Sequence, residues 1–304
     1  MDVTTVPDAP RRSVRSSLAP YAGLLASTAV LLTGCSAAEA GGADPDTPGK
    51  PIAIGQVPKI TDAEQLTLPL DAYQLSPRDA RKVQDALDTL VTDCMTKQGF
   101  AWAPPQRPPV REGSRNGRRY GLLDPEEGSQ TGYHVTGTTG QGAKGKEQGQ
   151  DGSATAQEAA GQCVLTQRAK LNGQQKADKA ASGPDELVER LVVENASRAE
   201  RDPQVRAVWS QWSDCMDQAG YSYDGPWDSN NDREFATPEP TDKERAVASA
   251  DAKCKQKHNV AGVWMAVETA YQKRAIETNA EALEEARKAN ETRLRNAADA
   301  LGQG

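Results

Sequence analysis

The sequence of 304 residues contains little of what enzyme sites and large packed cores usually require. It has only two histidines, His134 and His258, and two phenylalanines, and 37% of its residues are hydrophobic. So few histidines leave little room for acid–base or nucleophilic chemistry based on imidazole. So low an apolar content argues against one large core and predicts small helical units joined by solvated segments.

The sequence patterns of common catalytic and metal sites are also missing. No GxSxG, GxxxxGK[ST] or HExxH motif is present, and no two cysteines form a CxxC pair. His134 lies in a Gly-rich stretch, and His258 ends a predicted helix, whose dipole favours a cation at that end. We therefore predict no enzymatic activity, no cofactor and no metal site. An envelope hydrolase remains a less favoured alternative.

The sequence also lacks a net positive charge and a long apolar run, and both absences limit the partners that the protein could bind. The formal net charge is −7 at pH 7, which argues against general binding to nucleic acid. Beyond the N-terminal region, no apolar run approaches the length of roughly 18 residues that a membrane span needs. Only a covalently attached lipid would then hold the mature chain at a membrane.

The N-terminal region carries features of an export sequence. Three arginines between residues 11 and 15 precede an apolar span over 18–32, which is too short to cross a bilayer as a helix. This span ends in Leu-Thr-Gly-Cys35, which resembles the lipobox of bacterial lipoproteins. The resemblance implies a signal peptide over 1–34 and acylation of the Cys35 thiol. A plain secretory signal with a chance cysteine, or an uncleaved anchor, is the alternative. We expect a lipidated, flexible tether over 35–75.

The other four cysteines are an even number in an exported chain, which indicates two disulfides. The segments TDCMTKQGFAW (92–102) and SDCMDQAGYSY (213–223) align without a gap and indicate an internal duplication. A later helical stretch in each copy contains one further cysteine. The sequence permits three connectivities, and the simplest pairs Cys94 with Cys163 and Cys215 with Cys254.

The copies predict helices with defined ends. Ser76-Pro77 and Asp202-Pro203 are typical of helix starts, and Gly99 and Gly220 stand where a left-handed C-terminal cap belongs. Alternating aromatic residues follow each glycine. We interpret these rings as core residues, with exposed rings for stacking on sugars or apolar ligands as the alternative.

The predicted fold class is all-α, with two tandem disulfide-stapled three-helix units after a disordered N-terminal tether. Unit 1 covers 76–181, and the unit 2 region covers 182–304 and ends in a long helix that runs to Ala300. A helix over 184–201 is expected to close the first unit. For the long C-terminal helix we expect a single charged helix braced on the domain, with a coiled-coil stripe as the alternative.

Unit 1 contains an insertion within 103–154, because the spacing from Cys94 to Cys163 exceeds that from Cys215 to Cys254 by 30 residues. Five arginines in the insertion form the one local charge reversal of the chain: Arg107, Arg111, Arg115, Arg118 and Arg119. Such a cluster would suit an anionic polymer or a lipid head group. The alternative, which we favour, is a solvated, mobile loop.

The Cys35 pattern, the DCM-x-x-x-G-(F/Y) blocks and the lone later cysteines resemble exported lipoproteins of the high-GC Gram-positive, actinobacterial type. Trp212 stands three residues before Cys215, whereas the first copy has Val91 there. The resemblance implies a location on the outer face of the cytoplasmic membrane, but no activity. We expect a non-enzymatic binding or accessory role toward an anionic envelope polymer or another envelope protein, with a ligand-binding subunit of an envelope transporter as the alternative.

Overall fold

The computed structural model describes residues 51–107, 109–110, 115–134, 152–174 and 184–302. The signal peptide, Cys35 and the first part of the expected tether lie outside the described residues.

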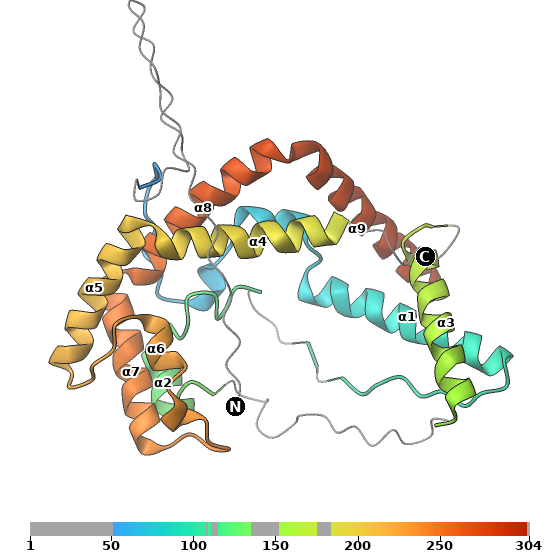
Figure 1. The fold of residues 1–304 in the computed structure, drawn as a ribbon, viewed down its shortest axis with the longest axis horizontal. Helices are drawn as coiled ribbons and strands as arrows, with labels where there is room; N and C mark the ends of the chain where they lie inside the picture. Colours follow the sequence, from blue (N-terminus) through green and yellow to red (C-terminus); the bar gives the residue numbers. More distant parts are fainter. Residues whose placement is uncertain (1–50, 108, 111–114, 135–151, 175–183, 303–304) are drawn as a thin grey trace, which may run out of the picture. The chain divides into compact units, whose positions relative to one another are not determined.

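Within the described ranges the fold is all-α, as predicted, and no strand is present (Figure 1). The helices are α1 (Pro77–Lys97), α2 (Pro125–Thr131), α3 (Ala154–Leu171), α4 (Pro184–Arg201), α5 (Pro203–Gln218), α6 (Pro226–Asn230), α7 (Asp242–Lys257), α8 (Val260–Thr278) and α9 (Ala280–Ala300). Three short 3₁₀ helices accompany them: η1 (Ala63–Gln65), η2 (Pro69–Tyr73) and η3 (Arg233–Phe235).

The helix ends follow from local sequence chemistry. The Ser76 hydroxyl accepts a hydrogen bond from the Asp79 amide at the start of α1, and the Asp202 carboxylate accepts one from the Gln204 amide at the start of α5. At the other ends, Gly99 has φ 80° and Gly220 has φ 88°, the left-handed conformation predicted for both. The residue after each glycine donates its amide hydrogen to the methionine carbonyl of the preceding turn, at 3.1 and 2.9 Å. The two copies of the cysteine pattern therefore have the same local geometry.

One three-helix group consists of α1, α3 and α9. Its core is made of small and medium-sized apolar side chains: Ala86, Leu87, Val91, Met95, Ala160, Cys163, Leu171 and Ala297. The prediction that α4 closes this group is wrong, because α4 packs along α8 and α9 (Figure 1). The α4 residues Val188 and Leu191 meet Leu283 and Ala286 of α9 in a separate cluster, and α9 takes the place expected for α4.

The other three-helix group consists of α5, α7 and α8, with α2 and α6 packed on α7. Its core is rich in aromatic residues, and Trp264 of α8 lies at the centre. The ring of Trp264 contacts those of Tyr120, Trp209 and Trp227 at centroid distances of 5.0, 4.8 and 5.6 Å. These rings contribute much of the buried apolar surface of the group.

The C-terminal region forms two helices, α8 and α9, instead of the single long helix expected. The chain leaves the helical conformation at Asn279, where φ is −118°. The Asn279 side-chain amide donates to the Ala275 carbonyl at 2.7 Å, which is the kind of local competition that disfavours asparagine inside helices. The break lets α8 belong to the second group while α9 completes the first.

Residues 51–75, called here the N-terminal strap, are not the free tether that the composition suggested. Five of their side chains are buried: Ile52, Ile60, Leu66, Leu68 and Leu70. The Ile52 amide donates to the Asp202 carboxylate at 3.0 Å, and the Ile60 amide donates to the Asn259 side chain at 3.1 Å. The expected tether is therefore wrong for the strap, because its apolar side chains are buried on a body far away in sequence.

Residues 115–134, called here the docked segment, are likewise not a solvated loop. Tyr120, Leu122 and Leu123 are buried, and α2 packs on α7. The favoured interpretation of the insertion as a solvated, mobile loop is wrong for these residues. Residues 111–114 and 135–151 of the same insertion lie outside the described ranges. The insertion of the first unit thus contributes to the core of the second group.

Candidate functional site

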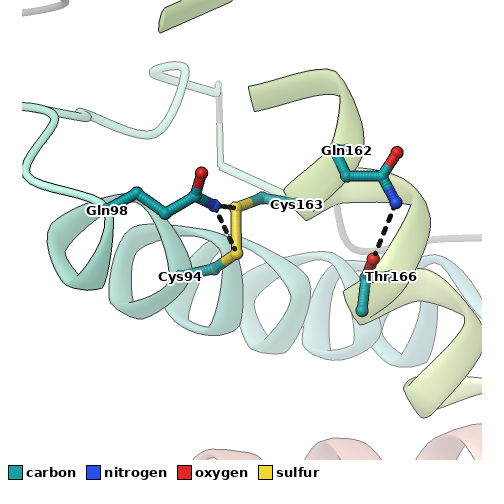
Figure 2. Close-up of a disulfide and its surroundings, with 5 residues drawn as sticks. All are labelled: Cys94, Gln98, Gln162, Cys163 and Thr166. Atoms are coloured by element: carbon teal, nitrogen blue, oxygen red, sulfur yellow. Dashed lines mark hydrogen bonds between the residues drawn. A yellow bond between two sulfur atoms is a disulfide. The ribbon is translucent and has the colours of Figure 1, made fainter. Parts of the chain in front are cut away.

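The two disulfides have the predicted connectivity. Cys94–Cys163 joins α1 to α3 and Cys215–Cys254 joins α5 to α7, with Cα–Cα distances of 5.9 and 5.7 Å. Figure 2 shows the first of them with the Gln98 side chain lying over the bond. The Gln98 Nε2 donates to Cys163 Sγ at 3.0 Å and to Cys94 Sγ at 3.6 Å. Cys163 is 1% exposed, whereas Cys94 is only partly buried.

A fully buried carboxylate, that of Glu268 on α8, gathers partners from several parts of the fold. Arg119 forms a salt bridge with it, and its Nε lies 3.2 Å from Glu268 Oε2. The Tyr120 hydroxyl donates to the same oxygen at 3.1 Å. Burial and the negative charge of Glu268 both raise the pKa of Tyr120 well above its ordinary value, so this phenol stays a hydrogen-bond donor.

Glu268 also reaches the N-terminal strap through a second side chain. The Gln272 Nε2 donates to Glu268 Oε1 at 2.8 Å, and Gln272 Oε1 accepts from the Leu70 amide at 2.9 Å. Arg119 in turn donates to the Val192 carbonyl of α4 at 3.2 Å. One buried carboxylate therefore links the docked segment, the strap, α4 and α8.

A second buried ion pair lies within α7. Lys255 Nζ donates to Asp251 Oδ2 at 2.8 Å, and the indole of Trp212 donates to Asp251 Oδ1 at 2.9 Å. Lys255 also donates to the Leu122 carbonyl of the docked segment at 3.3 Å. Burial raises the pKa of Asp251, an effect that Lys255 opposes. The neighbouring Gly121 has φ 78°, and a Cβ there would lie 2.6 Å from Lys255 Nζ, so only glycine fits beside this pair.

A third buried carboxylate, Glu244 of α7, holds the end of the docked segment. Its Oε1 accepts from the Tyr133 amide at 2.8 Å, and its Oε2 lies 3.5 Å from His134 Nε2. His134, expected in a mobile loop, is thus placed against a carboxylate. All three carboxylates are fully buried and hold parts of the fold together. Buried and bound carboxylates of this kind are typical of structural groups, and no two of these three form an exposed acid pair.

The four described arginines of the predicted anion-binding cluster all have partners inside the protein, and Arg111 lies outside the described residues. Arg107 forms a salt bridge with Asp88 of α1, and Arg118 pairs with Glu127 at 2.6 Å. Arg115 donates to the Leu75 carbonyl at 2.6 Å. Arg119 is bound to Glu268. These arginines fasten the insertion to α1, the strap and α8, and they do not form one exposed basic surface.

The aromatic residues after the two capping glycines are partly buried and pack against the two cores, which agrees with the interpretation from the sequence. Phe100 and Trp102 pack on the α1–α3–α9 core, and Tyr221, Tyr223 and Trp227 pack on the core of the second group. The Tyr223 hydroxyl donates to Asp232 at 2.8 Å. These rings are therefore placed to support the helices above them.

The expectation that the dipole of α7 favours a protonated His258 at the end of this helix is wrong. Burial lowers the pKa of His258, and the nearby charge of Lys257 lowers it further. The charge of Asp214 opposes these two effects, but the net shift is downward, opposite to the shift that a helix dipole would cause at this end.

A surface groove lies between α8 and the strap. It has a volume of about 680 Å³. Met265, Ala266 and Ala270 form an apolar stretch along it, and the charged side chains of Lys273 and Glu277 lie near one end. It offers a surface of mixed character for a partner.

Among the described residues, no group of three or more His, Cys, Asp or Glu side chains is arranged to hold a metal ion, and no helix is long and apolar enough to cross a membrane.

No family model, no curated protein and no solved structure matches this chain.

Proposed function

We propose that this protein is a lipid-anchored component of the cell envelope, acylated at Cys35, with a non-enzymatic binding or accessory role on the outer face of the cytoplasmic membrane. The observation that carries the proposal is the use of the cysteines. Of the five cysteines, four are paired with one another in disulfides, so Cys35 has no cysteine partner within the chain. Disulfides are typical of exported proteins, and Cys35 stands where a lipobox would place it.

The N-terminal strap changes how such an anchor would act. If the free tether ended at residue 75, some 40 residues would separate the lipid from the body and would reach roughly 35 Å on average. Because the strap is bound from Ile52 onward, only about 15 residues separate it from Cys35, and a random coil of that length would reach roughly 20 Å. The proposed anchor would therefore keep the body close to the membrane.

A binding role rather than catalysis is supported by the state of the buried polar groups. Glu268, Asp251 and Glu244 are fully buried and bound to other parts of the fold. The partner would accordingly use the surface, where the groove along α8 lies next to the strap that leads to the anchor. Another envelope protein fits this mixed surface better than an anionic polymer, because the described arginines of the insertion are held by internal acceptors.

Replacing the sulfur atom of Cys35 with an oxygen tests the proposed anchor. Cys35→Ser removes the sulfur that would be acylated, and we expect the protein to lose incorporation of a labelled fatty acid and to appear in the soluble fraction or as an uncleaved precursor. The neighbouring Ser36→Ala is the matched control and should behave as the wild type. Normal cleavage and unchanged membrane retention of Cys35→Ser would contradict the proposal.

A further inference from the structure

Among the positions at which the two copies differ, one lies beside the disulfides. Four residues after the first cysteine, the first copy has Gln98 and the second has Ala219. The Gln98 amide donates to both sulfurs and lies closer to Cys163 Sγ, at 3.0 Å (Figure 2). The methyl group of Ala219 cannot donate. A hydrogen-bond donor aimed at a sulfur stabilises the thiolate more than the disulfide, because it binds the charged form more strongly.

We propose that Cys94–Cys163 is a thiol-exchange site that an external thiol or dithiol opens and closes reversibly. The attacking thiolate forms a bond to Cys94 Sγ, since Cys94 is partly exposed whereas Cys163 is 1% exposed. The sulfur–sulfur bond of the protein breaks, and its electron pair leaves with Cys163 as a thiolate that accepts the hydrogen bond from Gln98. Gln98 thus acts on the leaving group.

A dithiol reagent completes the reaction. Its second thiolate attacks the mixed disulfide at the reagent sulfur, which releases the Cys94 thiolate and leaves the reagent as a disulfide. The protein takes up two electrons from the reagent, and two protons from it convert both cysteines to thiols. The reverse sequence restores the Cys94–Cys163 bond at the expense of an external disulfide.

Opening this bond has a structural consequence that opening the other lacks. Apart from Cys163, the side chains that α3 buries are small: three alanines and one leucine, Ala156, Ala160, Ala169 and Leu171. The apolar side chains that α7 buries are also small, Val247, Ala248 and Ala252, but α7 in addition buries the ion pair of Asp251 with Lys255 and packs on α2, α5, α6 and α8, whereas α3 packs on α1 and α9. Helix α3 therefore depends on the Cys94–Cys163 disulfide to stay packed on α1. Release of α3 would expose Leu87 and Val91 of α1.

The experiment compares the two disulfides in one molecule. The full chain, with free thiols first blocked by N-ethylmaleimide, is treated with dithiothreitol at neutral pH, and new thiols are labelled and located by peptide mapping. We expect Cys94 and Cys163 to be labelled before Cys215 and Cys254. Gln98→Ala should slow opening of the first disulfide about fivefold, the effect of one ordinary hydrogen bond on a rate. Gln98→Glu should slow it further, because a carboxylate repels the departing thiolate.

Gln162→Ala is the matched control, because Gln162 is adjacent to Cys163 in sequence but its side-chain amide donates to the Thr166 hydroxyl at 3.4 Å (Figure 2). It should leave the rate unchanged. In denaturant, Gln98→Ala and the wild type should react at the same rate, since the contact to the sulfurs is lost there. Equal opening of both disulfides in the folded wild type, or a folded Gln98→Ala that reacts like the wild type, would overturn the proposal. Hydrogen exchange that leaves α3 fully protected after selective reduction would overturn the release of this helix.

Discussion

Glu268 shows how much of this structure depends on single buried polar residues. Its carboxylate accepts from Arg119, Tyr120 and Gln272, which come from the docked segment and from α8 itself. Such a group stabilises a fold only while its partners remain in place, because each partner has given up its hydration.

We predict that Glu268→Ala lowers the free energy of unfolding by about 3 kcal/mol, because it leaves Arg119 and the Tyr120 hydroxyl without their acceptor. Urea denaturation followed by tryptophan fluorescence measures the change. Glu284→Ala is the control, since Glu284 forms exposed ion pairs with Arg287 and Lys288, and its unfolding midpoint should stay near that of the wild type. Equal midpoints for the two variants would contradict a structural role for Glu268.

At the scale of secondary-structure elements, several helix caps were predictable from the sequence, whereas the break at Asn279 and the packing partners of the helices were not. Ser76, Asp202 and Thr241 cap helices as their residue types suggest, and the glycines at 99 and 220 end them. Caps act over a few residues, so local chemistry decides them. An apolar stripe such as that of α4 shows only that one face is buried, and several other helices could have covered it.

The conformation of the capping glycines leads to a prediction with an internal control. Gly220→Ala should lower the free energy of unfolding by about 1 kcal/mol, because φ at this residue is 88° and a side chain disfavours that region. Gly161→Ala, in the middle of α3 with open space around it, should raise stability by up to about 1 kcal/mol. Thermal unfolding by circular dichroism measures both changes, and a Gly220→Ala variant as stable as the wild type or more stable would refute the assignment of Gly220 as a left-handed cap.

At the scale of the whole molecule, the predicted all-α class and the disulfide pairing hold, but tandem units do not describe the arrangement of the described helices. The insertion of the first unit docks on α7, and α9 packs on α1. The candidate site was only partly predictable for the same reason. Arg119 was identified as a basic residue of a loop, but its partner Glu268 is 149 residues away and nothing local to either residue reveals the pairing.

Burial of the strap gives a prediction for the intact molecule. Ile52→Ala and Ile60→Ala should each lower the free energy of unfolding by about 2–3 kcal/mol, because both side chains lie in the core of the second group. Val57→Ala in the same strap should change it by less than about 0.5 kcal/mol, because Val57 is 36% exposed. Chemical denaturation distinguishes these outcomes, and a strap that behaves as a free tether would show no effect in any of the three variants.

The place of α9 has a consequence for the order in which the protein is made. A ribosome produces α1 and α3 long before α9, the helix that covers them, and the strap is made before every helix on which it lies. Neither end of the chain can therefore acquire its final surroundings until synthesis is nearly finished. A premature stop that removes only α9 would leave intact everything that precedes it in sequence, yet it would uncover α1, α3, η2 and α4, all of which are made earlier.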